Sequence, residues 1–189
     1  IGRADYIIFT DKTTPNLNTI LYNGMEVNTL ANENLGNRYL FGGSLDGNLN
    51  LTDNLSLRAD LSIIEAIKSE QYGPLPSISP VFGSILLTYQ NKDWYTNLHY
   101  QFSGSKDPED YSLGGEDGLE ETPLISESQR LYAGTPSWSE FSILTQYQLS
   151  EKIFLRFGLD NIFDVHYRSF ASGISAPGRN FKLGVNISL

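Results

Sequence analysis

The chain has 189 residues, of which 12% are aromatic, and a formal net charge of −9 at pH 7. This length is enough for one domain with a sizeable core, and the acidic balance argues against a nucleic-acid partner. Cysteine is absent, which excludes a disulfide framework, a thiol nucleophile and a thiolate metal site. No apolar run approaches the roughly 18 residues of a membrane helix.

The first 35 residues predict one strand and one long loop. Residues 3–10 are rich in β-branched and aromatic side chains, which favours a strand. Residues 11–35 are rich in Asn, Thr, Gly and Pro and predict a loop, with room for local structure between Ile20 and Val27.

A long alternation of apolar and polar residues begins at Asn37. Because successive side chains of a strand point to opposite faces, it predicts strands with one apolar and one polar face. Two such strands, over 37–52 and 55–63, are joined at Asp53-Asn54, which is typical of a tight hairpin turn. The same pattern predicts further strands over 80–90, 94–102, 137–149, 153–159 and 179–189.

The connections between the eight predicted strands alternate in length. Short turns at 53–54, 91–93 and 150–151 fall on the side where the chain ends, and long segments at 11–35, 67–79, 104–136 and 164–177 fall on the other. This layout is typical of an antiparallel transmembrane β-barrel with periplasmic turns and extracellular loops. Open sheet edges are not tolerated in hydrocarbon, so the eight strands either close on themselves or are completed by strands outside this sequence.

The last strand carries the clearest alternation. Lys182, Gly184, Asn186 and Ser188 separate an apolar, lipid-facing set that consists of Phe181, Leu183, Val185, Ile187 and Leu189. We expect this set to take part in barrel assembly. The membrane assignment would fail if Leu155, Phe157 and Ile187 lay in a compact protein interior.

Several motifs resemble TonB-dependent outer-membrane receptors. They are Pro74-Leu75-Pro76 before a strand, Gly134-Thr135-Pro136-Ser137-Trp138 at the start of another, and the C-terminal series Asn161-Ile162-Phe163-Asp164, Tyr167-Arg168 and Pro177-Gly178-Arg179-Asn180. The resemblance implies a barrel of about 22 strands with a plugged lumen, of which residues 1–189 supply about the last eight. The plug domain and the TonB-contacting segment lie N-terminal in that family and match nothing here. The sequence departs from the family at Leu189, where an aromatic residue is usual.

The resemblance also implies a function. It predicts import of a scarce nutrient, such as a ferric siderophore or other metal chelate, across the bacterial outer membrane with energy delivered through TonB. The expected partners are outer-membrane lipid, the plug, the remaining barrel strands and the nutrient ligand. No cofactor is predicted.

The candidate ligand-binding residues are charged or titratable and lie on the polar, lumen-facing side: Arg58, Asp60, His99, Arg156 and Asp160. Alternatively, these residues are structural, with Arg58 pairing with Asp60 and Arg156 with Asp160. The outward aromatics Tyr39, Trp94, Tyr100 and Tyr147 predict belts at the membrane interfaces. The acidic segment 104–121 suits either a divalent cation or, as we favour, a solvated extracellular loop.

Enzymatic chemistry has no support in the sequence. There is no Ser-His-Asp order, nucleophile elbow or metal-ligand spacing, so we predict no catalytic and no metal site. Two other interpretations remain open. One is a self-contained eight-stranded barrel with a structural or adhesion role. The other is a soluble all-β domain, in which protein would cover Leu183, Val185 and Ile187.

Overall fold

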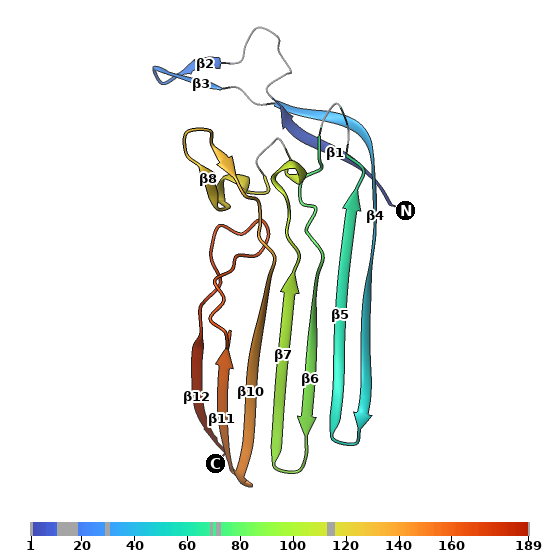
Figure 1. The fold of residues 1–189 in the computed structure, drawn as a ribbon, viewed down its shortest axis with the longest axis vertical. Helices are drawn as coiled ribbons and strands as arrows, with labels where there is room; N and C mark the ends of the chain where they lie inside the picture. Colours follow the sequence, from blue (N-terminus) through green and yellow to red (C-terminus); the bar gives the residue numbers. More distant parts are fainter. Residues whose placement is uncertain are drawn as a thin grey trace.

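The computed structural model describes residues 2–10, 19–28, 31–68, 70, 73–112 and 116–188, which form almost entirely antiparallel β-structure. One sheet contains eight strands in the order β1-β4-β5-β6-β7-β10-β11-β12 (Figure 1). Their bounds are β1 Gly2–Thr10, β4 Ala31–Thr52, β5 Leu55–Ala66, β6 Phe82–Gln90, β7 Trp94–Ser103, β10 Trp138–Ser150, β11 Ile153–Asp160 and β12 Asn180–Ile187.

All eight predicted strands are therefore confirmed, but the predicted loop over 11–35 is wrong in part. Strands β2 (Thr19–Tyr22) and β3 (Met25–Asn28) form a hairpin within it, and β4 begins at Ala31. The hairpin turns at Asn23 and Gly24, which both adopt positive φ, at 49° and 81°. An Asn-Gly pair is the residue choice that such a two-residue turn favours.

The alternation of short turns and long loops is confirmed. The β4–β5, β6–β7 and β10–β11 connections are short and lie at the end of the sheet where β12 finishes (Figure 1). The long β5–β6, β7–β10 and β11–β12 connections lie at the opposite end. The longest of them contains two 3₁₀ helices, η2 (Pro108–Asp110) and η3 (Leu119–Glu121), and a hairpin of β8 (Leu124–Ser126) and β9 (Leu131–Tyr132).

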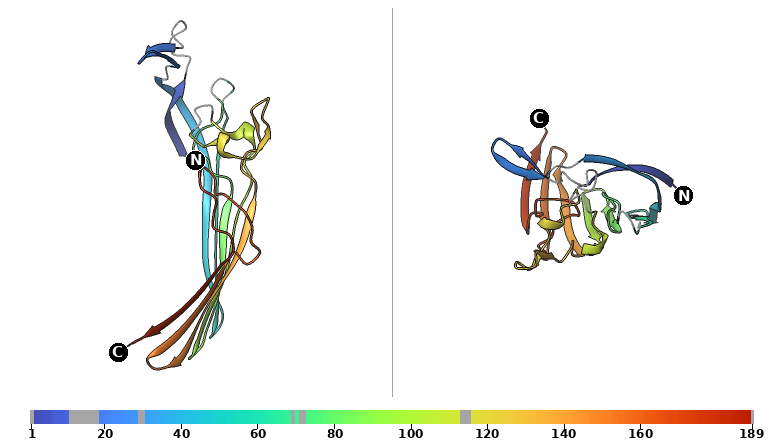
Figure 2. Two further views of the ribbon diagram at one scale, coloured as in Figure 1. Left: turned by 90° about the vertical axis from the view of Figure 1, so that its left-hand side faces the viewer. Right: turned by 90° about the horizontal axis from the view of Figure 1, so that it is seen from above.

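The sheet is curved but open. Seen from above, it forms an arc rather than a ring (Figure 2). Strands β1 and β12 are its two edges, and no pairing joins them in the described residues. The structure is thus a partial barrel, which does not support the alternative of a self-contained eight-stranded barrel.

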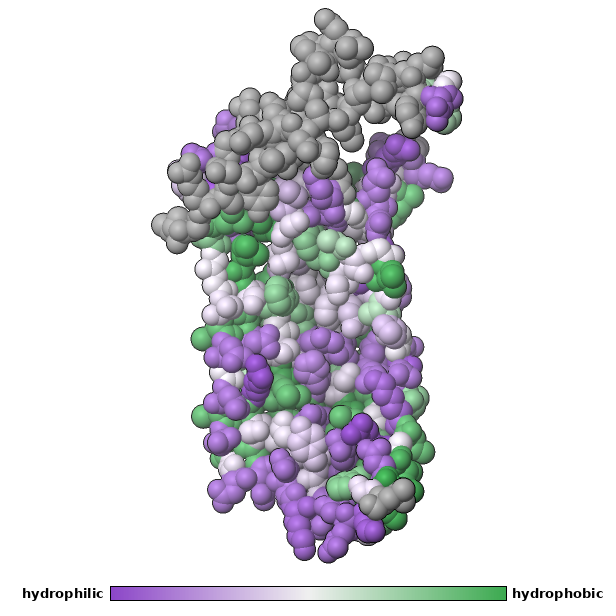
Figure 3. All heavy atoms as spheres, turned by 180° about the vertical axis from the view of Figure 1, so that it is seen from behind, coloured by the Kyte–Doolittle hydropathy of each residue, from purple (hydrophilic) through white to green (hydrophobic). Residues whose placement is uncertain are grey.

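The two faces of the sheet differ sharply in polarity. The inner face carries the polar side chains that alternate with the apolar ones. In Figure 3 the polar residues gather over the middle and lower part of the sheet, and hydrophobic residues lie along both margins. On the outer face, Leu155, Phe157 and Ile187 are 37%, 44% and 66% exposed. They do not lie in a compact interior, so the sheet has the two-sided character that the membrane assignment requires.

Burial of hydrophobic residues is confined to the loops. Leu75 and Tyr111 are the buried hydrophobic residues in the described part of the chain, and both lie in long loops. Leu183 and Val185 are exposed like Ile187, which contradicts the soluble-domain alternative. No helix among the described residues is long and apolar enough to cross a membrane.

Candidate functional site: the inner face and its loop cap

The five predicted ligand-binding residues lie on strands of the sheet, but the structure brings only two of them to one cavity. Asp60 of β5 stands opposite Ser84 of β6, and His99 of β7 stands opposite Leu86 of β6. Asp60 and His99 line a cavity of about 460 Å³, together with Ser84 and Gln101. We name it the inner-face cavity. Arg58, Arg156 and Asp160 are not among its described lining residues.

Both predicted charge pairs are replaced by other pairs. Arg58 pairs with Asp46 on the neighbouring strand, with Nη2 3.2 Å from Oδ2, and does not pair with Asp60. Asp160 pairs with Lys182 of β12 and not with Arg156. Each observed pair is a diagonal neighbour across two strands. Such neighbours lie within reach of long side chains, and they can be identified only when the strand register is known.

The cavity floor is held by hydrogen bonds. The hydroxyl of Ser84 donates to Asp60 Oδ1, and Gln101 Nε2 donates to Glu140 Oε1 at 2.6 Å. Glu140, which is buried, also accepts a hydrogen bond from the Ser142 hydroxyl at 2.9 Å. Because Glu140 is buried and accepts two hydrogen bonds, it fixes the Gln101 amide at the cavity.

Aromatic residues border the cavity on its loop side. Trp138 at the start of β10 and Phe170 of the β11–β12 loop line it, and Phe82 of β6 lines it from the wall. Trp138 also stacks on Tyr167, with ring centroids 4.0 Å apart, and this stack lines a second pocket of about 370 Å³ together with His166 and Arg168. Burial raises the pKa of the Tyr167 phenol, and the nearby Glu140 carboxylate adds to the effect.

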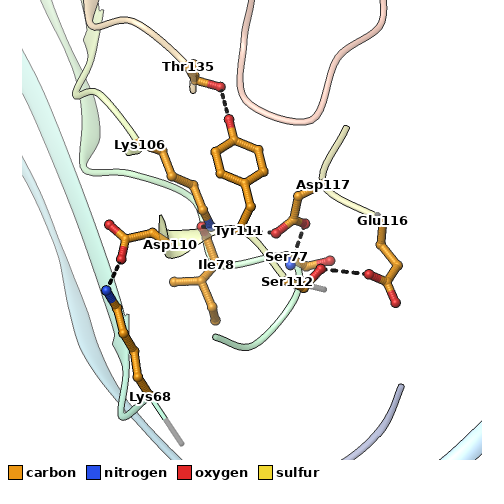
Figure 4. Close-up of polar contacts among 10 residues, drawn as sticks. All are labelled: Lys68, Ser77, Ile78, Lys106, Asp110, Tyr111, Ser112, Glu116, Asp117 and Thr135. Atoms are coloured by element: carbon orange, nitrogen blue, oxygen red, sulfur yellow. Dashed lines mark hydrogen bonds and ion pairs between the residues drawn. The ribbon is translucent and has the colours of Figure 1, made fainter. Parts of the chain in front are cut away.

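Above the cavity, a buried lysine joins the long loops. The Lys106 side chain is 5% exposed, and its Nζ lies 3.6 Å from Oδ2 of Asp117, whose side chain is 2% exposed (Figure 4). Its ammonium donates to the carbonyl of Ile78, and Asp117 Oδ1 accepts the backbone N–H of Ser77 at 2.7 Å. The prediction that the acidic segment is a solvated loop is therefore incomplete, because the Lys106–Asp117 pair within it is buried.

The surroundings of Lys106 extend this cluster. The Tyr111 hydroxyl forms a hydrogen bond with Thr135 Oγ1, and the backbones of Lys106 and Thr135 exchange two hydrogen bonds of 2.9 and 3.0 Å. Burial lowers the pKa of the Lys106 ammonium, against the opposing effect of Asp117. Burial likewise raises the pKa of the Tyr111 phenol. We call Lys106, Asp117, Tyr111 and Thr135, with the Ile78 carbonyl, the Lys106 cluster.

The C-terminal motif is a structural device. Asn161 is buried, and its amide donates to the carbonyls of Val165 at 2.8 Å and Pro177 at 3.2 Å. Its Oδ1 accepts the Val165 N–H at 2.8 Å. A few residues on, Asp164 Oδ1 accepts the N–H of Arg179 at 2.8 Å. These bonds fold the β11–β12 loop back on itself and set where β12 begins.

Four of the five predicted assembly residues of the last strand lie on the exposed outer face, as expected: Phe181, Leu183, Val185 and Ile187. The fifth, Leu189, lies outside the described residues. Their role in assembly stays a prediction. In the described residues, no group of three or more His, Asp or Glu side chains is placed to hold a metal ion.

Sequence reasoning missed the importance of Lys106, Trp138 and Phe170. Lys106 is the one lysine within the acidic segment 104–121, and Trp138 was noted only as part of a motif. Phe170 carried no signal, because its significance comes from packing between loops that are distant in sequence.

The fold is that of the C-terminal barrel portion of a TonB-dependent receptor, as the motifs predicted. The copper transporter OprC superimposes with a TM-score of 0.70 at 20% identity over 99% of this chain and 26% of OprC. A mutant of the ferric enterobactin receptor PfeA from Pseudomonas aeruginosa gives 0.67 at 20% identity over 99% of this chain and 28% of PfeA. The siderophore receptor PiuA from Acinetobacter baumannii gives 0.57 at 16% identity over 98% of this chain and 25% of PiuA.

The chain thus spans about a quarter of the length of the structures that it matches. These neighbours are transport receptors and not enzymes. No known family model matches the sequence, and no curated protein matches it.

Proposed function

We propose that this chain forms part of the barrel wall and of the extracellular loops of an outer-membrane import receptor for a scarce nutrient, such as a ferric siderophore. In this proposal, a plug domain and the remaining strands lie outside the sequence, and TonB supplies energy through the plug. The observation that carries the proposal is an open eight-stranded sheet with an exposed apolar outer face. Such a face suits lipid, and the open edges suit completion by further strands.

The outer-face aromatics support a membrane position for the sheet. One group, near the short turns, contains Trp94 and Tyr147, with ring centroids 4.6 Å apart. The other, near the loops, contains Tyr100 and Phe141 at 4.5 Å, with Phe102 at 5.8 Å from Tyr100. Trp94 and Phe102 are about 27 Å apart along β7 at about 3.4 Å per residue. A tilt of about 40° projects this distance to about 21 Å, close to the apolar band of about 25 Å in such barrels.

The nature of the cargo draws support from the neighbours. Among the fold relatives are receptors for ferric enterobactin and other siderophores, together with a copper transporter. A metal chelate is therefore the cargo class that we propose. The inner-face cavity offers it a carboxylate, an imidazole and an amide, beside aromatic side chains.

Deletion of the full-length gene in its host tests the proposal. We expect loss of uptake of one radiolabelled metal chelate from a panel, with recovery when the gene is restored. Recovery should fail when TonB is also absent. Unchanged uptake of every chelate in the deletion strain would refute the import role.

A further inference from the structure

One ammonium group contacts three separate loops. Lys106 belongs to the β7–β10 connection and donates to Ile78 of the β5–β6 loop. Its Nζ lies 4.4 Å from the ring centroid of Phe170, which belongs to the β11–β12 loop. Within its own connection it pairs with Asp117. An aromatic face attracts a desolvated cation, so each of the three loops contributes to holding the same charge.

Phe170 links this charge to the inner-face cavity. Phe170 lines the cavity, and its ring is close to the Lys106 ammonium and meets Tyr111 edge-on, with ring centroids 6.0 Å apart. The position of Phe170 at the cavity therefore depends on the Lys106 cluster.

We propose that Lys106 is a positioning residue that fastens the three loops into one unit and thereby keeps Phe170 over the inner-face cavity. If any one loop moves away, the buried Lys106 ammonium loses one of its partners, and a buried charge without its partners costs free energy. The loops accordingly move together or not at all. The role of the cavity as a ligand site rests on the proposed function, whereas the role of Lys106 in covering it does not.

The structure offers a matched control. Lys68 and Asp110 also form an ion pair that joins the β5–β6 loop to the β7–β10 connection, but their side chains are 53% and 40% exposed. Water solvates both groups when that pair breaks, so it contributes little to holding the loops. Lys68→Met therefore removes a loop-joining charge without removing the buried one.

Amide hydrogen exchange on the full-length protein in outer-membrane vesicles tests the cooperative unit. We expect Lys106→Met to raise exchange at least tenfold in residues 73–81, 104–112 and 161–179 together, and Lys68→Met to change it less than twofold. Faster exchange in residues 104–112 alone would overturn the proposal. If the single variant does not assemble, the double variant Lys106→Met with Asp117→Asn removes both charges, and it must show the same joint increase.

Residues 1–189 contain no cysteine, so labelling of a thiol introduced here is read as the increase over the full-length protein without that substitution. His99→Cys places the thiol in the cavity, and Asn97→Cys places one two residues away on the same strand, outside its described lining. With Lys106→Met, we expect maleimide labelling of Cys at 99 to rise at least tenfold and that at 97 to stay within twofold. An equal rise at both positions, or at neither, would overturn the proposal. Chelate transport is not needed for this readout, so failure of the proposed function would be seen separately.

Discussion

Replacement of Asn161 by alanine tests whether the C-terminal motif acts as a structural clasp. The substitution removes three hydrogen bonds, two from the amide to the carbonyls of Val165 and Pro177 and one from the Val165 N–H to Oδ1. Each typical hydrogen bond contributes about 1 kcal/mol, and the stranded buried partners add to the loss. Asn161 also has φ at 46°, a conformation that costs alanine about 1–2 kcal/mol. We therefore expect a local destabilisation of about 3–5 kcal/mol.

The assay is exchange of the Val165 amide in the full-length protein in lipid vesicles. A loss of 3 kcal/mol corresponds to opening that is more frequent by about 100-fold. Asn161→Gly should lose the same hydrogen bonds but regain about 1 kcal/mol, because glycine tolerates positive φ. Asn180→Ala is the matched control, since Asn180 is exposed and its side-chain amide donates a long hydrogen bond of 3.4 Å to Asp160. Exchange at the wild-type rate in Asn161→Ala would refute the reasoning.

Three further predictions concern the wall, the loop cap and the surface charges. Leu98→Lys on the outer face should cost about 2–4 kcal/mol in urea titrations of vesicle-embedded protein, whereas Ser44→Lys, at an exposed position on the inner face of β4, should stay within about 0.5 kcal/mol; equal costs would contradict the assignment of the faces. Burial raises the pKa of Tyr111, so its contribution to stability is complete below about pH 10, the value of an unperturbed tyrosine, and falls as pH rises through the raised value; exchange of the loop amides should therefore accelerate above pH 10 in the wild type more than in Tyr111→Phe. Arg58 and Asp46 are exposed, so a double-mutant cycle with alanine at both positions should give a coupling below about 1 kcal/mol, and a larger value would mean that the pair is less solvated than its geometry indicates.

The strands could be predicted because the two faces of the sheet differ in polarity. Phe157 lies on the apolar outer face and its neighbour Arg156 on the polar inner face, so the period of two persists along the whole strand. The hairpin at 19–28 was anticipated only as local structure between Ile20 and Val27, because its Asn23-Gly24 turn lies in a stretch whose composition is typical of loops. Turn chemistry was the better guide there.

The site could be predicted only in part. The inner-face position of Asp60 and His99 follows from alternation alone, whereas their meeting in one cavity depends on register between strands. The pairing of Arg58 with Asp46 depends on register too. Burial of Lys106 depends on the packing of Ile78, Asp117 and Phe170, which lie on three loops, and no local pattern encodes that packing.

The placement of the buried residues explains why the loops, rather than the sheet, hold the charged cluster. In a water-soluble domain the apolar sides of strands pack against each other and loops cover the surface. Here the apolar face is left exposed, and the buried hydrophobic residues of the described chain, Leu75 and Tyr111, lie in loops. The loops therefore need a packed interior of their own, and Lys106 is fixed within it. Under the proposed function, substitutions of inner-face residues on the strands should therefore change chelate binding without changing this loop interior.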